Sequence, residues 1–110
     1  MAKIITIKAD KERHLKLGVN GLIQLEEDLG KPVSEISEGI GMKEFRAILY
    51  LALKWEDKSL TYEATGELMD LIIEDKGFEY LGETIGKLIQ GAMGVLPSQG
   101  WWVPWWKSHF

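Results

Sequence analysis

The chain has 110 residues and no cysteine, and its 17 acidic and 13 basic residues give a formal net charge of −4. This length predicts one domain with a modest core, and the lack of cysteine excludes disulfides, thiolate metal sites and cysteine nucleophiles. The apolar runs are far shorter than the roughly 20 residues of a membrane span. No basic segment leads into an apolar run with a cleavage site, so we expect the chain to stay where it is made.

The charge is unevenly distributed along the sequence. Residues 1–20 hold five basic and two acidic residues, whereas residues 21–99 hold seven basic and fifteen acidic ones. An acidic body repels phosphate backbones, so we expect no nucleic-acid partner for it. Its carboxylates are typical of solvated helix surfaces.

The first predicted element is a β-hairpin. The segment 3–8 is rich in β-branched residues, "ADKE" is a polar turn, and "RHLKLG" alternates apolar and polar residues. A period of two places Ile5 and Ile7 on one face of the first strand and Leu15 and Leu17 on one face of the second. Two strands alone are marginal in water, so we expect helices to cover this apolar face.

The period becomes helical from Asn20, which we expect to cap the first helix. The apolar stripe of this helix consists of Leu22, Leu25 and Leu29. Gly30 suits the position just after a helix, and Pro32 prevents continuation. A short glycine-rich turn then begins at Ser34.

Three longer helices are predicted after this turn. The first covers Met42–Asp57, and its expected buried face consists of Phe45, Ile48, Leu49, Ala52 and Trp55. Thr61 caps the second, Gly77 ends it, and its buried side consists of Leu68, Met69, Ile72 and Ile73. The third covers Phe78–Met93 and closes at Gly94; its apolar face consists of Phe78, Leu81, Ile85, Leu88, Ile89 and Ala92.

The expected fold is therefore mainly α, a small α+β protein with an N-terminal β-hairpin followed by a bundle of about four helices. Residues 1–94 form the hairpin and bundle domain, and residues 95–110 form a linker and a tryptophan-rich tail. We found no internal repeat in the sequence.

The sequence carries no recognisable catalytic or metal-binding motif. His14 and His109 lie at opposite ends of the chain, and "GIGMKE" lacks the spacing of a phosphate-binding loop. Glu26, Glu27 and Asp28 are adjacent on a helix and point about 100° apart, so they cannot converge as an acid–base pair. One of them is free to pair with the basic hairpin. We expect a non-enzymatic protein without cofactor or metal.

Gly82 and Gly86 form a GxxxG pattern in the last helix. Such small residues allow close approach between helices. Two interpretations stay open: close packing inside the bundle, or a seam for self-association.

In this order the elements resemble the tail assembly chaperones of long-tailed bacteriophages and of the related gene transfer agents. The resemblance covers roughly residues 3–93. In that family a hairpin precedes a helix that ends in a Leu-Glu-Glu…Gly signature, matched here by Leu25, Glu26, Glu27 and Gly30. A helix ending before a short acidic break is matched by Phe45–Asp57, and a helix beginning with Thr-x-Glu is matched by Thr61–Glu63.

The resemblance implies a function in assembly and names partners. Such a chaperone binds the long helical tape measure protein and keeps it soluble while the tail tube is assembled. It is displaced as tail tube protein polymerises, so it belongs to the cytoplasm of the infected or lysogenic bacterial host and is absent from the finished virion. We expect a homo-oligomer. The alternative function is a small tail completion or connector protein that stays in the virion.

The C-terminal sequence "GWWVPWWKSHF" holds four of the five tryptophans: Trp101, Trp102, Trp105 and Trp106. A buried tryptophan covers about 150–250 Å², so the four together hide about 600–1,000 Å². The largest apolar patch on a typical monomer is only about 300–600 Å². We therefore predict that these four residues contact a partner or another surface.

The covering surface stays open at this point. An extended tail, favoured by Val103 before Pro104, points Trp101 and Trp105 to one side and their neighbours to the other; a helical tail places all four on one face. The tail either folds back over its own bundle or docks on a sister subunit or the tape measure protein. A membrane is the weaker option, because only Lys107 supplies positive charge nearby.

Overall fold

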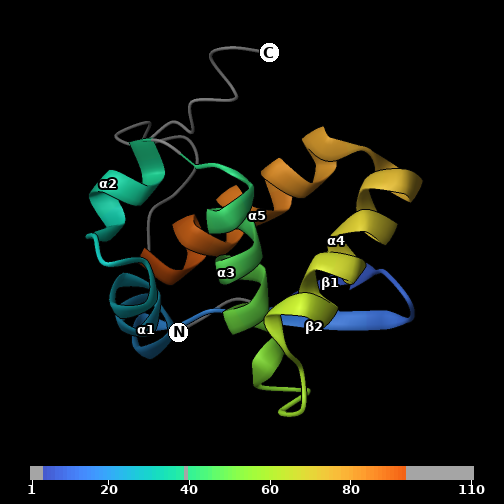
Figure 1. Ribbon diagram of the computed structural model, residues 1–110, viewed down its shortest axis with the longest axis horizontal. Helices are drawn as coiled ribbons and strands as arrows, with labels where there is room; N and C mark the ends of the chain where they lie inside the picture. The colour runs from blue at the N-terminus through green and yellow to red at the C-terminus, as the bar shows by residue number, and fades with distance from the viewer. Residues whose placement is uncertain (1–3, 39, 94–110) are drawn as a thin grey trace.

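A computed structural model describes residues 4–38 and 40–93 of the chain. The described residues are mainly helical, with an antiparallel β-hairpin followed by helices, as predicted. The described ranges contain two strands and five helices, of which α2 (Val33–Glu38) is short. Figure 1 shows α3 in the middle, with α1 and α2 to one side, α4 to the other, and α5 passing behind it.

The hairpin has the predicted inner face. Strand β1 (Ile4–Lys8) pairs with β2 (Glu12–Lys16), with Ile5 opposite Leu15 and Ile7 opposite Arg13. Ile7, Leu15 and Leu17 are buried, and β2 contacts α3. The helices therefore cover the apolar face that two strands alone cannot bury.

Helix α1 (Val19–Leu29) begins two residues earlier than predicted. Gly18 takes the N-cap position with extended backbone and no side-chain cap bond, so the prediction of Asn20 as cap is wrong: Asn20 already lies in the first turn. The predicted end is confirmed. Gly30 has a φ of 69°, in the left-handed region, and its N–H donates to the Glu26 carbonyl at 2.8 Å.

Helix α3 (Met42–Lys54) contacts α1, α4, α5 and β2. Its buried residues are Phe45, Ala47, Ile48, Leu49, Ala52 and Leu53. The helix ends three residues before the predicted Asp57, and Trp55 does not belong to the core, because it is 43% exposed. Its indole Nε1 instead donates to the His14 carbonyl at 2.9 Å, and Lys16 Nζ lies 5.4 Å from its ring centroid.

Helices α4 (Tyr62–Lys76) and α5 (Phe78–Met93) have the predicted boundaries. The Thr61 hydroxyl accepts the Ala64 N–H at 3.1 Å, which confirms the predicted cap. Gly77, with a φ of 90°, separates the two helices. Gly82 and Gly86 are both buried, in agreement with close packing inside the bundle. Gly94, the predicted end of α5, lies outside the described residues.

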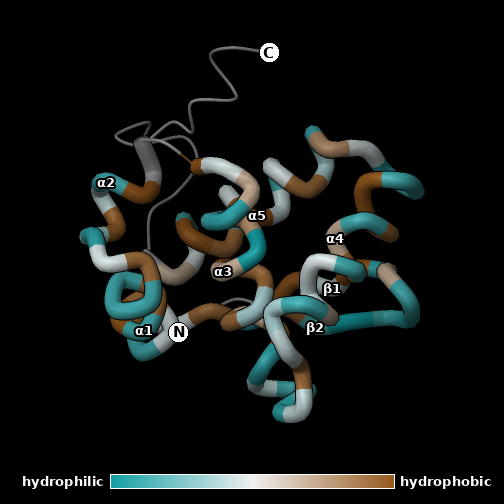
Figure 2. Tube along the Cα trace, viewed as in Figure 1, coloured by the Kyte–Doolittle hydropathy of each residue, from teal (hydrophilic) through white to brown (hydrophobic). Residues whose placement is uncertain are grey.

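One hydrophobic core joins all of these elements. Leu25 of α1, Ile72 of α4 and Ile85 of α5 are almost fully buried in the same cluster as the residues of α3. Figure 2 shows hydrophobic and hydrophilic stretches alternating along each helix, as expected for helices with one buried face. The Phe45 and Phe78 rings meet edge to face, with 5.4 Å between centroids.

Arg13 ties the hairpin to the loop after α3. Its side chain is 7% exposed on the inner face of the hairpin, and its guanidinium donates two bonds to the Asp10 carboxylate, at 2.9 and 3.0 Å. A third bond, at 3.1 Å, reaches Asp57 in the loop. The bonds from Arg13 lower the pKa of Asp10, and bonds from Ser59 and then Arg13 lower the pKa of Asp57.

Replacing Arg13 tests this connection. We expect Arg13→Met to lower the free energy of unfolding by about 2 kcal/mol at pH 7, because three charge-assisted bonds are lost while the apolar stem is kept. The exposed Lys11→Met in the same turn is the matched control, with an expected change within about 0.5 kcal/mol. Urea titration followed by circular dichroism measures both.

The contacts of Arg13 also predict that the stability of the protein depends on pH. Because the pKa values of Asp10 and Asp57 are lowered in the folded state, their stabilisation is present above the ordinary value of 3.8. It is lost as the pH falls from there through the folded pKa values. The difference in the free energy of unfolding between wild type and Arg13→Met should therefore decrease as the pH is lowered. A difference that stays constant from pH 7 to pH 2 would contradict the assignment.

Candidate functional site

The sequence-predicted contact residues lie outside the part of the chain that the structure describes. Trp101, Trp102, Trp105 and Trp106 belong to residues 94–110, so their prediction stays untested. Within residues 4–38 and 40–93, no group of three or more His, Asp or Glu residues is arranged to hold a metal ion. Among these same residues, no helix is both long and apolar enough to cross a membrane.

The three adjacent carboxylates of α1 do not form a site either. Glu26 Oε2 accepts the N–H of Val33 at 2.8 Å, which satisfies a free amide at the start of α2. Asp28 accepts bonds from Gln24 Nε2 at 2.8 Å and from the Tyr62 hydroxyl at 3.0 Å. These two carboxylates therefore connect α1 to the start of α2 and to α4.

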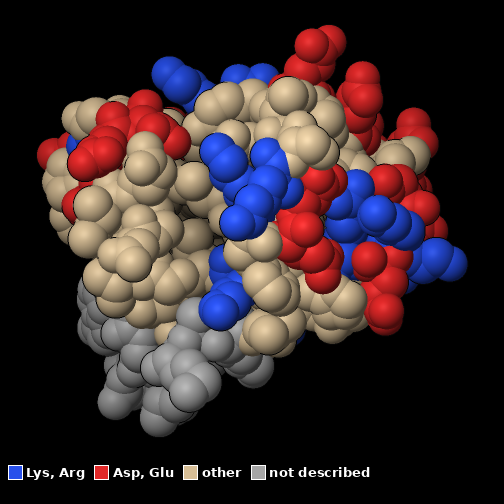
Figure 3. Space-filling view, turned by 90° about the horizontal axis from the view of Figure 1, so that it is seen from below, with Lys and Arg blue, Asp and Glu red and all other residues tan. Residues whose placement is uncertain are grey.

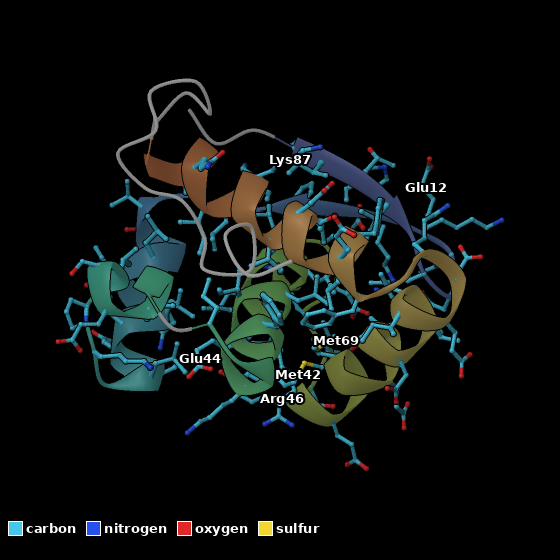
Figure 4. The ribbon with its side chains drawn as sticks, turned by 90° about the horizontal axis from the view of Figure 1, so that it is seen from above. Glu12, Met42, Glu44, Arg46, Met69 and Lys87 are labelled. Carbon is cyan, nitrogen blue, oxygen red and sulfur yellow. The ribbon has the colours of Figure 1, made fainter. Side chains whose placement is uncertain are left out.

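A groove between α3 and α4 is the candidate partner site. It is open to solvent, encloses about 430 Å³ and is lined by Met42, Lys43 and Arg46 of α3 and by Gly66, Met69 and Asp70 of α4. Figure 4 shows Met42, Arg46 and Met69 beside one another between the two helices, whereas Glu12 and Lys87 lie across the molecule on the hairpin and α5.

Gly66 leaves the floor of the groove open. It sits inside α4, where a glycine is unfavourable by about 1 kcal/mol relative to alanine. A Cβ placed on it would meet only the Arg46 Cδ, at 3.8 Å, which is ordinary contact. Nothing in the described structure therefore requires a glycine here.

Stacked aromatic rings lie beside Arg46. The Tyr50 and Tyr62 rings stack with 4.4 Å between centroids. Lys54 lies 5.0 Å from the Tyr50 ring and Arg46 lies 5.3 Å from the Tyr62 ring, both within cation–π range. Burial, together with the bond to Asp28, raises the pKa of Tyr62 to about 12, so this hydroxyl stays protonated at neutral pH.

The two sides of the groove carry opposite charges. The α3 side has the exposed Lys43 and Arg46, and Arg46 is held over a tyrosine ring. The α4 side has the exposed Asp70. A helical period places further exposed carboxylates on the same stripe of α4 as Asp70, namely Glu63, Glu67 and Glu74. We call these two sides the basic wall and the acidic wall.

Away from the groove, positively and negatively charged side chains are mixed on the surface. Figure 3 shows Lys and Arg side chains interspersed with Asp and Glu on the face seen from below. On the hairpin side, His14 Nδ1 lies 2.7 Å from Glu56 Oε2, which lowers the pKa of Glu56. This face is not a uniform basic surface of the kind that follows a phosphate backbone.

Sequence reasoning missed the groove but not all of its residues. Met69 was correctly predicted to be buried, and Met42 was placed at the start of its helix. The signal that was available is Gly66, an isolated glycine within a strong helical pattern. The sequence of either helix alone does not predict that α3 and α4 lie on the two sides of one groove.

Two glycine substitutions test this account of the groove. We expect Gly66→Ala to raise the free energy of unfolding by about 0.5–1 kcal/mol, because the new Cβ fits and helix propensity improves. Gly77→Ala is the contrasting variant: its φ of 90° disfavours any L side chain, so stability should fall by about 1 kcal/mol or more. Thermal and urea unfolding measure both. A destabilising Gly66→Ala would mean that the groove floor is more crowded than described.

Comparison with models of known protein families, with curated proteins and with solved structures found no match to this chain.

Proposed function

We propose that this protein is a tail assembly chaperone of a long-tailed bacteriophage or gene transfer agent, which binds the tape measure protein and keeps it soluble during tail tube assembly. It acts without catalysis, cofactor or metal, in the cytoplasm of the bacterial host. It is released as tail tube protein polymerises and is absent from the mature virion. The observation that carries the proposal is the open groove between α3 and α4, a surface suited to a helix of a largely helical client.

The residues that carry the resemblance occupy defined structural positions in the fold, and this supports the proposal. Leu25 is fully buried, Glu26 accepts the first amide of α2, and Gly30 adopts the left-handed backbone that ends α1. Thr61 caps α4. A signature made of such positions specifies a scaffold, and the client surface then lies on that scaffold's exposed faces.

Co-expression with the tape measure protein tests the function. We expect wild type to keep the tape measure protein in the soluble fraction and to co-purify with it. Gly66→Leu should weaken this association about tenfold, because a leucine side chain fills the groove, and each factor of ten corresponds to about 1.4 kcal/mol. Gly66→Ala is the matched control and should behave like wild type. A tape measure protein that stays insoluble and unbound beside wild type overturns the proposal.

Mass spectrometry of purified virions separates this function from the alternative. A chaperone is missing from the particles, whereas a tail completion or connector protein is present at a fixed number of copies.

The tryptophan-rich tail is the second proposed contact, in a homo-oligomer or with the client. Truncation after Gln99 removes Trp101, Trp102, Trp105 and Trp106, and light scattering measures the mass of both chains. We expect the intact chain to be a multimer and the truncated chain to be a folded monomer. Equal masses, with truncation only lowering the melting temperature, would assign the four tryptophans to the chain's own core instead.

A further inference from the structure

We infer that the groove between α3 and α4 binds one amphipathic helix of a partner protein, with acidic residues along one flank of its apolar seam and basic residues along the other. We further infer that the two charged walls set the direction in which this helix lies. The inference rests on the proposed function only for the natural source of the helix, which would be the tape measure protein. The chemistry of recognition follows from the groove itself.

The floor of the groove suits an apolar seam. Met42 is 52% exposed, although its side chain is apolar, and it lines the groove beside Met69, which is buried and only 4% exposed. Methionine side chains are flexible and adapt to different apolar partners. Gly66 adds no side chain at the floor, where the nearest described atom is the Arg46 Cδ, 3.8 Å from the position that a Cβ would take. A helix laid here buries its own apolar residues between α3 and α4.

The walls select the flanks of the helix by charge. A helix with acidic residues on both flanks meets repulsion from Asp70 on the acidic wall. A helix with basic residues on both flanks meets repulsion from Lys43 and Arg46 on the basic wall. Only a helix with one acidic and one basic flank is complementary to both walls, and like-charge contacts are an effective means of excluding other partners.

Opposed walls also fix direction. Turning an amphipathic helix end over end, with its seam still in the groove, exchanges its left and right flanks. Only one of the two directions therefore places the acidic flank against α3 and the basic flank against α4. A groove with uncharged or equally charged walls has no such preference.

Three synthetic helical peptides with the same leucine seam test the selection. One has an acidic and a basic flank, one has two acidic flanks, and one has two basic flanks. We expect the full-length protein to bind the mixed peptide about tenfold more tightly than either other peptide by calorimetry, since a few exposed ion pairs contribute about 0.2–1 kcal/mol each.

Reversal of one wall should switch the preference. With Lys43→Glu and Arg46→Glu together, both walls are acidic, and the peptide with two basic flanks should become the tightest ligand. With Glu63→Lys, Glu67→Lys, Asp70→Lys and Glu74→Lys together, both walls are basic, and the peptide with two acidic flanks should become the tightest. Lys87→Glu is the matched control: it reverses an exposed charge on α5, away from the groove (Figure 4), and should leave the ranking unchanged.

Energy transfer tests the direction. Because the chain has no cysteine, Lys58→Cys, in the loop that joins α3 to α4, gives a single site for an acceptor dye. A donor on the N-terminus of the mixed peptide and a donor on its C-terminus should give clearly unequal transfer. Equal transfer from both ends would overturn the inferred direction.

Each remaining outcome decides the inference. Equal binding of all three peptides, or a ranking unchanged by both wall reversals, overturns it. Binding that occurs only after truncation at Gln99 also overturns the inference, because the chain's own tail would then be the occupant. Binding that occurs only after dilution to monomer overturns it too, because the occupant would then be a second copy of the chain. Selective binding of the mixed peptide without binding of the tape measure protein would uphold the groove and reject the proposed function. If the tape measure protein binds and the wall reversals do not change this binding, the proposed function is upheld and the inference about the groove is rejected.

Discussion

The attachment of the hairpin to the end of α3 is the constraint on which the rest of the structure depends. Two strands do not hold together alone in water, and the outer edge of β2 offers backbone groups that need partners. At His14 both groups are used: its carbonyl accepts the Trp55 indole N–H at 2.9 Å, and its N–H donates to Glu56 at 3.3 Å. Arg13 adds the bonds to Asp10 and Asp57 from the inner side.

This attachment also positions the groove. Asp57, which accepts a bond from Arg13, also accepts bonds from both the N–H and the hydroxyl of Ser59, at 3.2 and 2.7 Å. The loop that they order leads directly to Thr61, which caps α4. The next residue, Tyr62, stacks on Tyr50 of α3, and its hydroxyl donates to Asp28 of α1. The separation of α3 and α4, and with it the space over Gly66, follows from this chain of contacts.

Most of the fold is predictable from the sequence where the cause is local. Gly30, Thr61 and Gly77 end or begin helices because of their own backbone or side-chain chemistry, and each was found. Trp55 was wrongly predicted to be buried and Arg13 was given no role, because their partners His14 and Asp57 lie 41 and 44 residues away. The period of two does place Arg13 on the buried face beside Leu15, and Asp10 lies nearby in the same turn, but only the fold brings in the second carboxylate, Asp57, for the buried guanidinium.

The strength of the available contacts bears on which of the two proposed functions the molecule suits. Permanent interfaces are large and strongly apolar. Among the described residues, the exposed large apolar side chains are divided among β1, α1, α3, α4 and the loop after α3. The groove adds the exposed Met42 and exposed charges, whose ion pairs contribute only about 0.2–1 kcal/mol each and are screened by salt. Such contacts suit a helix that is held and then given up when a competing assembly grows, which favours the chaperone over a component retained in the particle.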